Sequence, residues 1–355
     1  ALGAAACGAA PGAPRDCACE DGGNGSGRQL FGEGVGAGVG AGAGPGGGLF
    51  RTSPFLMTHD SATGYIGDGD LLYRDSARTQ SVNLREQLDC GARVLGLRVL
   101  VNGDDFQDIR FHHTSSIAGG YHVGWVSEDQ RLSNTLPGLV EWSRAHPEEL
   151  VMLAVSKCFT KSSSSVLPLF GKFGWRQLDC ADARLMKAFT DLGVKVETSC
   201  HKLTKWTLLE ARQAARMDGG GRMLVIPGEG KDDCMASNYD PQVQNFDQVR
   251  PYVVRTMKAA MSQDTMFQIQ AFRQQSGLVV PLDAELNQEV KSWLEEDPSV
   301  FKGVNMLEIN GICAYGPAIA TSRLLGTSVS QEDRDMCRAH CMRACHRRGA
   351  CAWPV

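Results

Sequence analysis

The feature that most constrains the fold of this chain is a series of short apolar runs that alternate with helical stretches. We predict strands at Phe55–Thr58, Val94–Val101, Ile109–Phe111, Leu150–Val155, Val194–Val196, Met223–Ile226, Met266–Gln270 and Val304–Leu307. We predict helices at Thr79–Leu88, Leu136–Ala145, Asp247–Met261 and Leu286–Glu295. About eight strands that alternate with helices fit a parallel barrel better than a sandwich. The sequence therefore predicts an α/β fold, a distorted TIM-type (β/α) barrel.

The barrel is expected to occupy residues 51–327, because a chain of 355 residues can bury one large core. Residues 1–50 are dominated by Gly and Ala, which lose much backbone entropy on ordering and offer little surface to bury, so we predict a disordered leader. A glycine-rich phosphate loop is the alternative, but no strand precedes this segment and no Gly-Lys-Ser/Thr follows it. Residues 328–355 form a Cys-rich tail.

Charge and hydropathy argue against a nucleic-acid partner and against a transmembrane segment. The net charge is −4, the isoelectric point is near 6.1, and no run of Lys and Arg follows a helix face, so a nucleic acid is not expected as a partner. No window approaches the roughly 18 consecutive apolar residues of a transmembrane segment, and any membrane contact is expected at the surface. We expect a monomer.

The thirteen cysteines point to an oxidising compartment, and hence to a secreted, extracellular protein. Three of them lie in the first nineteen residues and four in the last nineteen. In the tail, Cys337, Cys341 and Cys345 are spaced i,i+4, so they would line one face of a helix and find disulfide partners elsewhere. A zinc site with His340 or His346 is the alternative, although the tail lacks a close C-x-x-C pair.

Three polar clusters stand at or near the ends of predicted strands: Thr58–Ser61, Leu97–Val99 and Phe111–Thr114. The chemistry of a parallel barrel lies at the C-terminal ends of its strands. Two histidines could act there as base and acid near neutral pH, and an arginine could bind two phosphate oxygens at once. The clusters therefore predict cleavage of a phosphodiester.

Simpler interpretations exist for each cluster taken alone. The pair of His59 and Asp60 could be a cap or a surface ion pair. Arg98 is harder to dismiss, because a charge inside an apolar strand needs a carboxylate or a ligand. Of His112 and His113 only one can face the site, because adjacent strand residues point in opposite directions.

The order and spacing of these clusters resemble the X region of phosphatidylinositol-specific phospholipase C over residues 54–157. The matching motifs are Thr58–Gly64, Thr79–Gln80, Leu84–Arg98, Phe111–His113 and His146–Met152. The resemblance implies a distorted, incompletely closed α/β barrel. It also implies that His59 is the general base on the inositol 2-hydroxyl, with Asp60 as its catalytic neighbour, and that His113 rather than His112 is the general acid.

Further site residues are implied by the same resemblance. Arg98 stands where the calcium-dependent enzymes carry metal-binding carboxylates, so we predict the metal-independent, bacterial-type arrangement with no cofactor and no metal. An acidic residue late in the barrel should pair with His59, and Glu308 is the first candidate and Asn310 the second. Substrate contacts are predicted for Lys157, Gln270 and Arg273. The strand Met223–Ile226 runs into Pro227-Gly228-Glu229 instead of an inositol-binding arginine, which leaves the headgroup open.

The sequence thus predicts a phospholipase C-type phosphodiesterase that cleaves a phosphoinositide-like phospholipid or glycolipid through a cyclic phosphate. One alternative is a metal-dependent phosphodiesterase acting on glycerophosphodiesters or sphingomyelin. A second alternative is a secreted binding protein on a degenerate barrel, without catalysis. Convergence of His59, Arg98 and His113 on one phosphate-sized space would discriminate against this last alternative.

Overall fold

The computed structural model describes residues 48–67, 77–117, 121–161, 175–228, 234–237, 243, 245–261, 263–275, 278–279, 283–301, 303–322, 325, 327 and 329–347. Most of the predicted leader, residues 1–47, lies outside this part of the chain, as do Glu229 and Cys351. Phe50 falls within the range of the predicted leader, and its side chain is fully buried at the start of the 3-10 helix η2 (Phe50–Thr52).

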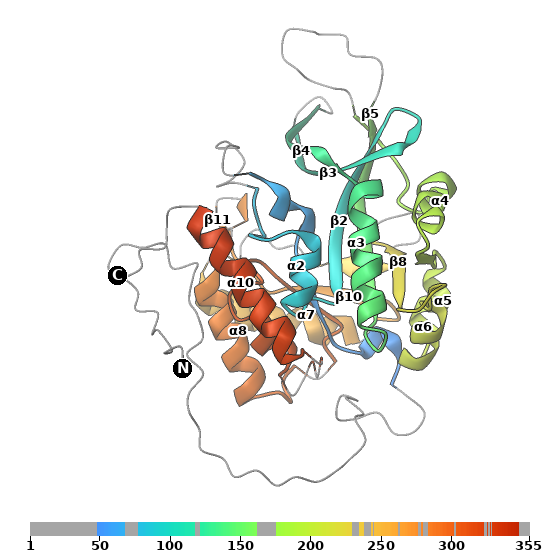
Figure 1. Ribbon diagram of the computed structural model, residues 1–355. Coiled ribbons are helices and arrows are strands. Elements are labelled where there is room, and N and C mark those ends of the chain that lie inside the picture. Colours follow the sequence, from blue (N-terminus) through green and yellow to red (C-terminus); the bar gives the residue numbers. More distant parts are fainter. Residues whose placement is uncertain are drawn as a thin grey trace.

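The centre of the protein is a curled sheet whose main path consists of parallel strands (Figure 1). In sheet order these strands are β7 (Lys195–Val196), β8 (Met223–Pro227), β5 (Val151–Lys161), β2 (Val94–Asn102), β1 (Phe55–Thr58), β13 (Met306–Ile309), β10 (Met266–Gln270) and β9 (Met235–Ser237). In the described residues β7 and β9 end this path and do not pair with each other. The predicted α/β fold, a distorted TIM-type barrel, is confirmed.

Antiparallel strands branch from β2 and β5, which lie inside the main path of the sheet. β3 (Asp105–Ile117) pairs with β2 and with β4 (Tyr121–Arg131), and β6 (Trp175–Gln177) pairs with β5. These strands rise above the barrel in Figure 1, with the long ends of β2 and β5. The segment Ile109–Phe111 is therefore a strand as predicted, but it belongs to an antiparallel extension and not to the barrel. A separate two-stranded sheet is formed by β11 (Gln274–Gln275) and β12 (Leu278–Val279).

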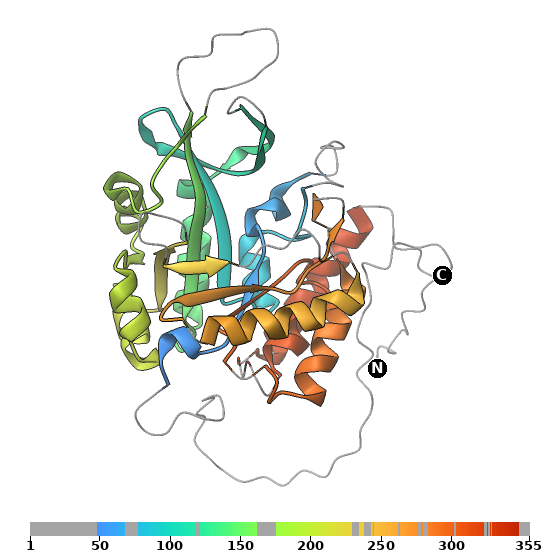
Figure 2. The same cartoon turned by 180° about the vertical axis from the view of Figure 1, so that it is seen from behind.

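Helices cover the outside of the curled sheet (Figures 1 and 2). They are α2 (Leu84–Asp89), α3 (Leu132–Ala145), α4 (Ala183–Asp191), α5 (Cys200–Lys205), α6 (Leu208–Ala214), α7 (Phe246–Met261), α8 (Ala284–Glu296), α9 (Gly316–Ala320) and α10 (Gln331–Arg347). Seen from behind, α7 lies beside β10 (Figure 2). No helix among the described residues is both long enough and apolar enough to cross a membrane.

Alternation along the strands divides the core into two layers. On β1, Leu56 packs outward against the helices, whereas Phe55 and Met57 point into the barrel. On β13, Leu307 and Ile309 pack outward and Met306 points inward. Period-two alternation then places Glu308 on the inward face, one step from Met306 toward the C-terminal strand ends.

The predicted helix at Thr79–Leu88 is wrong at its start, because α2 begins at Leu84. Asn83 caps the helix by accepting from the backbone N–H of Glu86, and the Glu86 side chain accepts from the N–H of Asn83 in return. Thr79 and Gln80 lie outside the helix, since their side chains hydrogen-bond to the backbone around the end of β1. The helix ends as predicted, with Gly91 at a positive φ of 98° directly after the C-cap residue Cys90.

The predicted disulfides of the tail are confirmed within the described residues. Cys337 is bonded to Cys90 and Cys341 to Cys313, so two cysteines of one helix face pair with distant partners. Two further disulfides join Cys158 to Cys180 and Cys200 to Cys234.

Candidate active site

The centre of the candidate site is the Asp60 carboxylate, in the turn between β1 and the 3-10 helix η3 (Ser61–Tyr65). Asp60 adopts the left-handed conformation, with φ 42° and ψ 50°. Asp and Asn tolerate this conformation better than most other side chains. It turns the chain sharply after β1 and leaves the His59 and Asp60 side chains 3.1 Å apart, from Nε2 to Oδ2.

Three cationic or titratable side chains meet at this carboxylate. Arg98 Nε lies 2.5 Å from Asp60 Oδ1, and His113 Nε2 lies 3.0 Å from Asp60 Oδ2. With His59 they come from three different strands or strand ends. The structure therefore brings together the predicted residues His59, Asp60, Arg98 and His113, which are up to 54 positions apart in the sequence.

Arg98 and His113 reach the site from neighbouring antiparallel strands. Arg98 is the partly exposed residue of the otherwise buried first part of β2, and β3 returns alongside it. The prediction that His113 lies at the end of a barrel strand is wrong, because β3 runs opposite to the barrel strands. Pairing with β2 nevertheless brings His113 to the same place.

His112 points to the other side of β3, as alternation requires. Its Nε2 lies 2.8 Å from the backbone carbonyl of Lys157, and its ring packs edge-on against Phe159 and Trp175. Burial lowers the pKa of His112 to about 3. His112 thus packs away from Asp60, and His113 is the member of the pair that contacts this carboxylate.

His59 is held by contacts on both ring nitrogens and on one ring face. Its Nδ1 lies 3.0 Å from Asn310 Oδ1, which accepts the Nδ1 proton. The ring is stacked on Phe272, with the centroids 4.3 Å apart and the planes 20° from parallel. Burial lowers the pKa of His59 to about 4, against the opposite effect of the Asp60 carboxylate. The lowered pKa favours an uncharged imidazole at neutral pH. Because Nδ1 donates to Asn310, Nε2 is the nitrogen that can take up a proton, next to the Asp60 carboxylate.

The partner of His59 is Asn310, the second candidate, and not Glu308. Both nitrogens of His59 are occupied by Asn310 and Asp60, and Glu308 lies against Gln268 and Gln270 of the adjacent strand. The alternation of side chains along β13 explains why Glu308 does not contact His59. Glu308 projects into the barrel, whereas Asn310 follows the end of β13 and lies beside His59.

Glu308 is nevertheless close enough to the site to be influenced electrostatically by Asp60 and Arg98. Its side chain is buried, and its Oε2 makes no hydrogen bond to the described residues. Burial raises the pKa of Glu308 to about 8, and the Asp60 carboxylate adds to this rise. Glu308 is therefore a neutral carboxylic acid beneath an ionised one at neutral pH.

Asp60 stays ionised for the opposite reason. Burial by itself raises the pKa of a carboxyl group, but Arg98, His59 and His113 hold the pKa of Asp60 well below its usual range. The two buried carboxyl groups thus differ in charge because only Asp60 contacts a guanidinium.

Side-chain hydrogen bonds hold the backbone of the turn after β1 in place. Thr79 Oγ1 donates to the His59 carbonyl over 2.7 Å, and Gln80 Nε2 donates to the same carbonyl and to that of Ile309. On the adjacent strand, a Cβ atom added to Gly96 would lie 3.1 Å from the Thr58 carbonyl oxygen and 3.6 Å from the Asp60 nitrogen. A larger residue at position 96 would therefore press on this turn.

The three predicted substrate-contacting residues have different surroundings. Lys157 is exposed, at a positive φ of 47°, where the pairing of β2 with β5 shifts register. Gln270 is buried beside Glu308. Arg273 Nε lies 2.5 Å from Asp283, and its guanidinium packs on the Phe246 ring. These contacts of Arg273 are with Asp283 and Phe246, and its role as a substrate contact stays a prediction.

Phe272 is a member of the site that was not predicted from the sequence. Its position two residues beyond the end of β10 was the only available signal, and many strand-end aromatics simply pack in the core. Thr79 and Gln80 appeared in the motif that resembles the phospholipases, but their role in holding the His59 carbonyl depends on the three-dimensional arrangement.

Comparison with solved structures identifies the fold. The phosphatidylinositol-specific phospholipase C of Listeria monocytogenes matches with a TM-score of 0.52 at 16% identity, over 81% of this chain and 97% of that one. A double mutant of the Staphylococcus aureus phosphatidylinositol-specific phospholipase C matches with a TM-score of 0.52 at 12% identity, over 80% of this chain and 95% of that one.

The chain shares the fold of these phospholipases. A single mutant of the Staphylococcus aureus enzyme gives the same TM-score of 0.52 at 12% identity. No protein-family profile matches the sequence, and no curated protein matches it. The likeness to the phospholipase C fold therefore rests on three-dimensional structure.

Proposed function

We propose that this protein is a phosphodiesterase of the phosphatidylinositol-specific phospholipase C type, which cleaves a phosphoinositide-like lipid at a membrane surface. The observation that carries the proposal is the convergence of His59, Arg98 and His113 within about 3 Å of one carboxylate. The phospholipase C fold supports it. A binding protein on a degenerate barrel would have no need for this convergence.

In the proposed mechanism His59 takes the proton of a hydroxyl group next to the phosphodiester. The unprotonated Nε2 can accept that proton, and Asn310 keeps the other nitrogen protonated. The Asp60 carboxylate, 3.1 Å from Nε2, stabilises the imidazolium that forms. The resulting alkoxide attacks phosphorus and yields a cyclic phosphate.

Arg98 and His113 act on the phosphate and on the leaving oxygen. The Arg98 guanidinium neutralises charge that develops on the phosphoryl oxygens, and His113 protonates the departing glycerol oxygen. The side chains of Arg98 and His113 are 18% and 15% exposed, against 6% for His59 and Asp60. The phosphate is therefore expected to approach from the side of Arg98 and His113.

The side chains at the centre favour a metal-independent reaction. Asp60 has one oxygen against Arg98 and the other against two histidines, so a divalent cation would have to displace these groups. Glu308 is neutral at pH 7 and would first have to lose its proton. Among the described residues, the one group with ligand atoms close enough together to surround an ion comprises Cys90, Cys337 and Cys341, and all three sulfurs are in disulfides.

The test is an assay of the full chain with vesicles of phosphatidylinositol, in the presence and absence of EDTA. We expect release of diacylglycerol and a water-soluble inositol phosphate at the same rate in both conditions. Vesicles of phosphatidylcholine and of sphingomyelin serve as controls for headgroup. Activity that EDTA abolishes would support the metal-dependent alternative, and no activity on any vesicle would contradict the proposal.

A further inference from the structure

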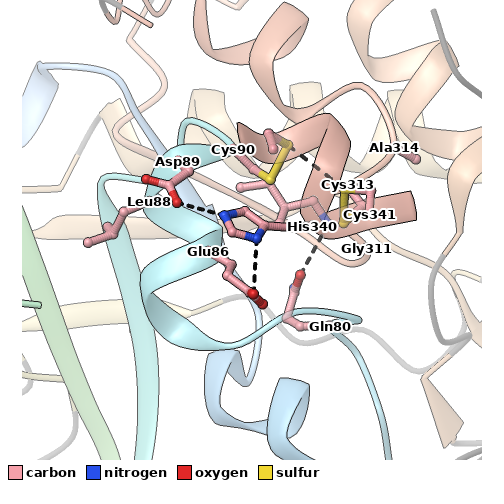
Figure 3. Close-up of a disulfide and its surroundings, with 12 residues drawn as sticks. Gln80, Glu86, Leu88, Asp89, Cys90, Gly311, Cys313, Ala314, His340 and Cys341 are labelled. Atoms are coloured by element: carbon pink, nitrogen blue, oxygen red, sulfur yellow. Dashed lines mark hydrogen bonds and ion pairs between the residues drawn. A yellow bond between two sulfur atoms is a disulfide. The ribbon is translucent and has the colours of Figure 1, made fainter. Parts of the chain in front are cut away.

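The C-terminal helix α10 carries two disulfides whose sulfur atoms nearly touch. The inner disulfide joins Cys337 to Cys90, at the end of α2, and the outer one joins Cys341 to Cys313, in the loop after β13. The Sγ atoms of Cys337 and Cys341 lie only 3.8 Å apart (Figure 3 shows the surroundings). Among the described residues, no other group of three cysteine, histidine or acidic side chains places its ligand atoms so close together.

The two disulfides differ in their access to solvent. Cys90 and Cys337 are buried, with 0% and 2% of their surface exposed, whereas Cys313 and Cys341 are only partly buried. A dithiol in solution can therefore attack the outer disulfide more readily than the inner one. The buried inner disulfide can be reached from the sulfur of Cys341.

Non-covalent contacts hold α10 in place independently of these disulfides. His340 lies between two carboxylates of α2, with 3.0 Å from Nδ1 to Glu86 and 3.0 Å from Nε2 to Asp89 (Figure 3). At the start of α10, Asp333 lies 3.2 Å from His146. These contacts would keep Cys341 beside Cys337 after the outer disulfide is reduced.

We propose that the four cysteines form a redox relay, in which one dithiol reductant releases both covalent links between α10 and the barrel. In the first step the dithiol reduces the outer disulfide, giving the thiols of Cys313 and Cys341 and the disulfide of the reductant. In the second step the Cys341 thiolate attacks Cys337 Sγ, the Cys337–Cys90 bond breaks, and Cys90 leaves as a thiolate that takes up a proton.

Together the two steps consume two electrons, and the protein loses one disulfide in total. The inner and outer disulfides are replaced by a single Cys337–Cys341 disulfide within α10, with Cys90 and Cys313 as free thiols. Cys α-carbons at i and i+4 of a helix lie about 6 Å apart, within the range of a disulfide. Their β-carbons lie about 5–6 Å apart on a regular helix and must approach to about 4 Å, so the new disulfide requires local distortion of α10. Among the described residues, α10 would then be held by non-covalent contacts alone.

The two disulfides that would be lost lie close in sequence to residues that hold the candidate site in place. Cys313 lies three positions after Asn310, the partner of His59, and Ile312 between them donates its N–H to Gln80 Oε1. Cys90 ends the helix that follows Gln80. The relay itself depends only on the sulfur positions, and so it stands or fails independently of the proposed phosphodiesterase activity.

The first experiment is titration of the oxidised full chain with a limiting amount of dithiothreitol, followed by acid quenching, labelling with N-ethylmaleimide and peptide mass spectrometry. We expect Cys90 and Cys313 to be labelled in equal amounts, with Cys341 largely unlabelled. The disulfide of Cys200 and Cys234 is an internal comparison, because it should give label on its own two cysteines equally. Label on Cys313 and Cys341, with the inner disulfide intact, would overturn the relay, and so would label on Cys337 in place of Cys90.

A variant tests the second step without any reductant. In Cys313→Ser the Cys341 thiol is free from the start, so we expect Cys90 to take up label and Cys341 to be protected. The double variant Cys313→Ser/Cys341→Ser is the matched control, in which Cys90 should remain unlabelled. If Cys313→Ser keeps Cys341 labelled and Cys90 unlabelled, the relay is wrong. The titration of the wild-type chain decides the question if this variant does not fold.

Discussion

At the residue scale, the titratable side chains around Asp60 differ in how far they are enclosed by neighbouring residues. His59 and His113 contact the same carboxylate oxygen, but His59 is enclosed by Asn310 and Phe272, whereas His113 is more exposed. An enclosed, neutral imidazole suits a base, and an imidazole nearer solvent suits the group that protonates a leaving oxygen. The structure thus gives the two histidines separate proposed roles.

Removal of either histidine should abolish most activity while the fold survives. We expect His59→Ala and His113→Ala each to lower kcat for phosphatidylinositol by about 10²–10⁴-fold, the usual contribution of a positioned acid or base. Circular dichroism and thermal unfolding check that each variant is folded. His112→Gln is the matched control, because it alters the neighbouring histidine on the structural side of β3 and should keep kcat. Full activity in either alanine variant would refute the assignment.

Phe272 should control the basicity of His59. The ring of Phe272 covers one face of the imidazole, and burial is the main cause that holds the pKa of His59 at about 4. In Phe272→Ala water reaches this face, so we expect the pKa of His59 to rise toward the ordinary value of about 6.5. NMR titration of the histidine ring protons measures the shift, with Phe272→Leu as an apolar control. An unchanged pKa in a folded Phe272→Ala variant would show that other groups keep water out.

Single residues could be predicted from the sequence where local pattern and chemistry agree. His59, Asp60, Arg98 and His113 follow from polar clusters near strand ends. The choice of Asn310 over Glu308 could not be made, because it depends on which residue of a strand end projects inward and which follows the turn. The contact of Arg273 with Asp283 likewise joins two segments whose distance the sequence does not reveal.

At the scale of elements, α10 shows how covalent and electrostatic links combine. His340 lies between Glu86 and Asp89 of α2, and both Cys337 and Cys341 are bonded to the barrel. Burial by itself would lower the pKa of His340, but hydrogen bonds to Asp89 and Glu86 raise it to about 9. A histidine with a raised pKa stabilises the fold fully below its unfolded pKa of about 6.5, and this contribution is lost as the pH rises through about 9.

The variant His340→Gln should therefore destabilise the protein in a pH-dependent way. We expect a loss of roughly 1–2 kcal/mol at pH 6, since partial solvent exposure weakens the ion pairs, and little difference from the wild type at pH 10. Urea unfolding at both pH values measures the difference. The exposed His201→Gln is a control that should change neither value. A loss of equal size at pH 6 and pH 10 would mean that His340 acts through packing and not through its charge.

Whether a segment forms a strand was easier to predict than which strands it pairs with. β1, β2, β5, β8 and β10 were recognisable as apolar runs. The strand at Ile109–Phe111 was also recognisable, but its antiparallel pairing was not, because a buried run reads the same in either direction. β9 was missed, since Met235–Ser237 is a three-residue strand with one large apolar side chain.

At the scale of the whole molecule, eight parallel strands carry the site on one end of a curled sheet. The predicted number of about eight was right although one of the predicted strands belongs to the antiparallel extension, because β9 takes its place in the barrel. The absence of pairing between β7 and β9 in the described residues agrees with the incompletely closed barrel that the resemblance implies. The strand pattern alone could not predict it, since closure depends on the pairing of the terminal strands. The leader and the end of the tail stay predictions, as they lie outside the described residues.

The order in which products appear from phosphatidylinositol tests the central claim, that two histidines and an arginine cleave a phosphodiester through attack by a neighbouring hydroxyl. Phosphorus NMR of the reaction, run with EDTA present, follows this order directly. We expect a cyclic inositol phosphate to accumulate first and any acyclic phosphate to follow later. An acyclic inositol phosphate formed from the start, or no turnover while EDTA is present, would contradict the claim.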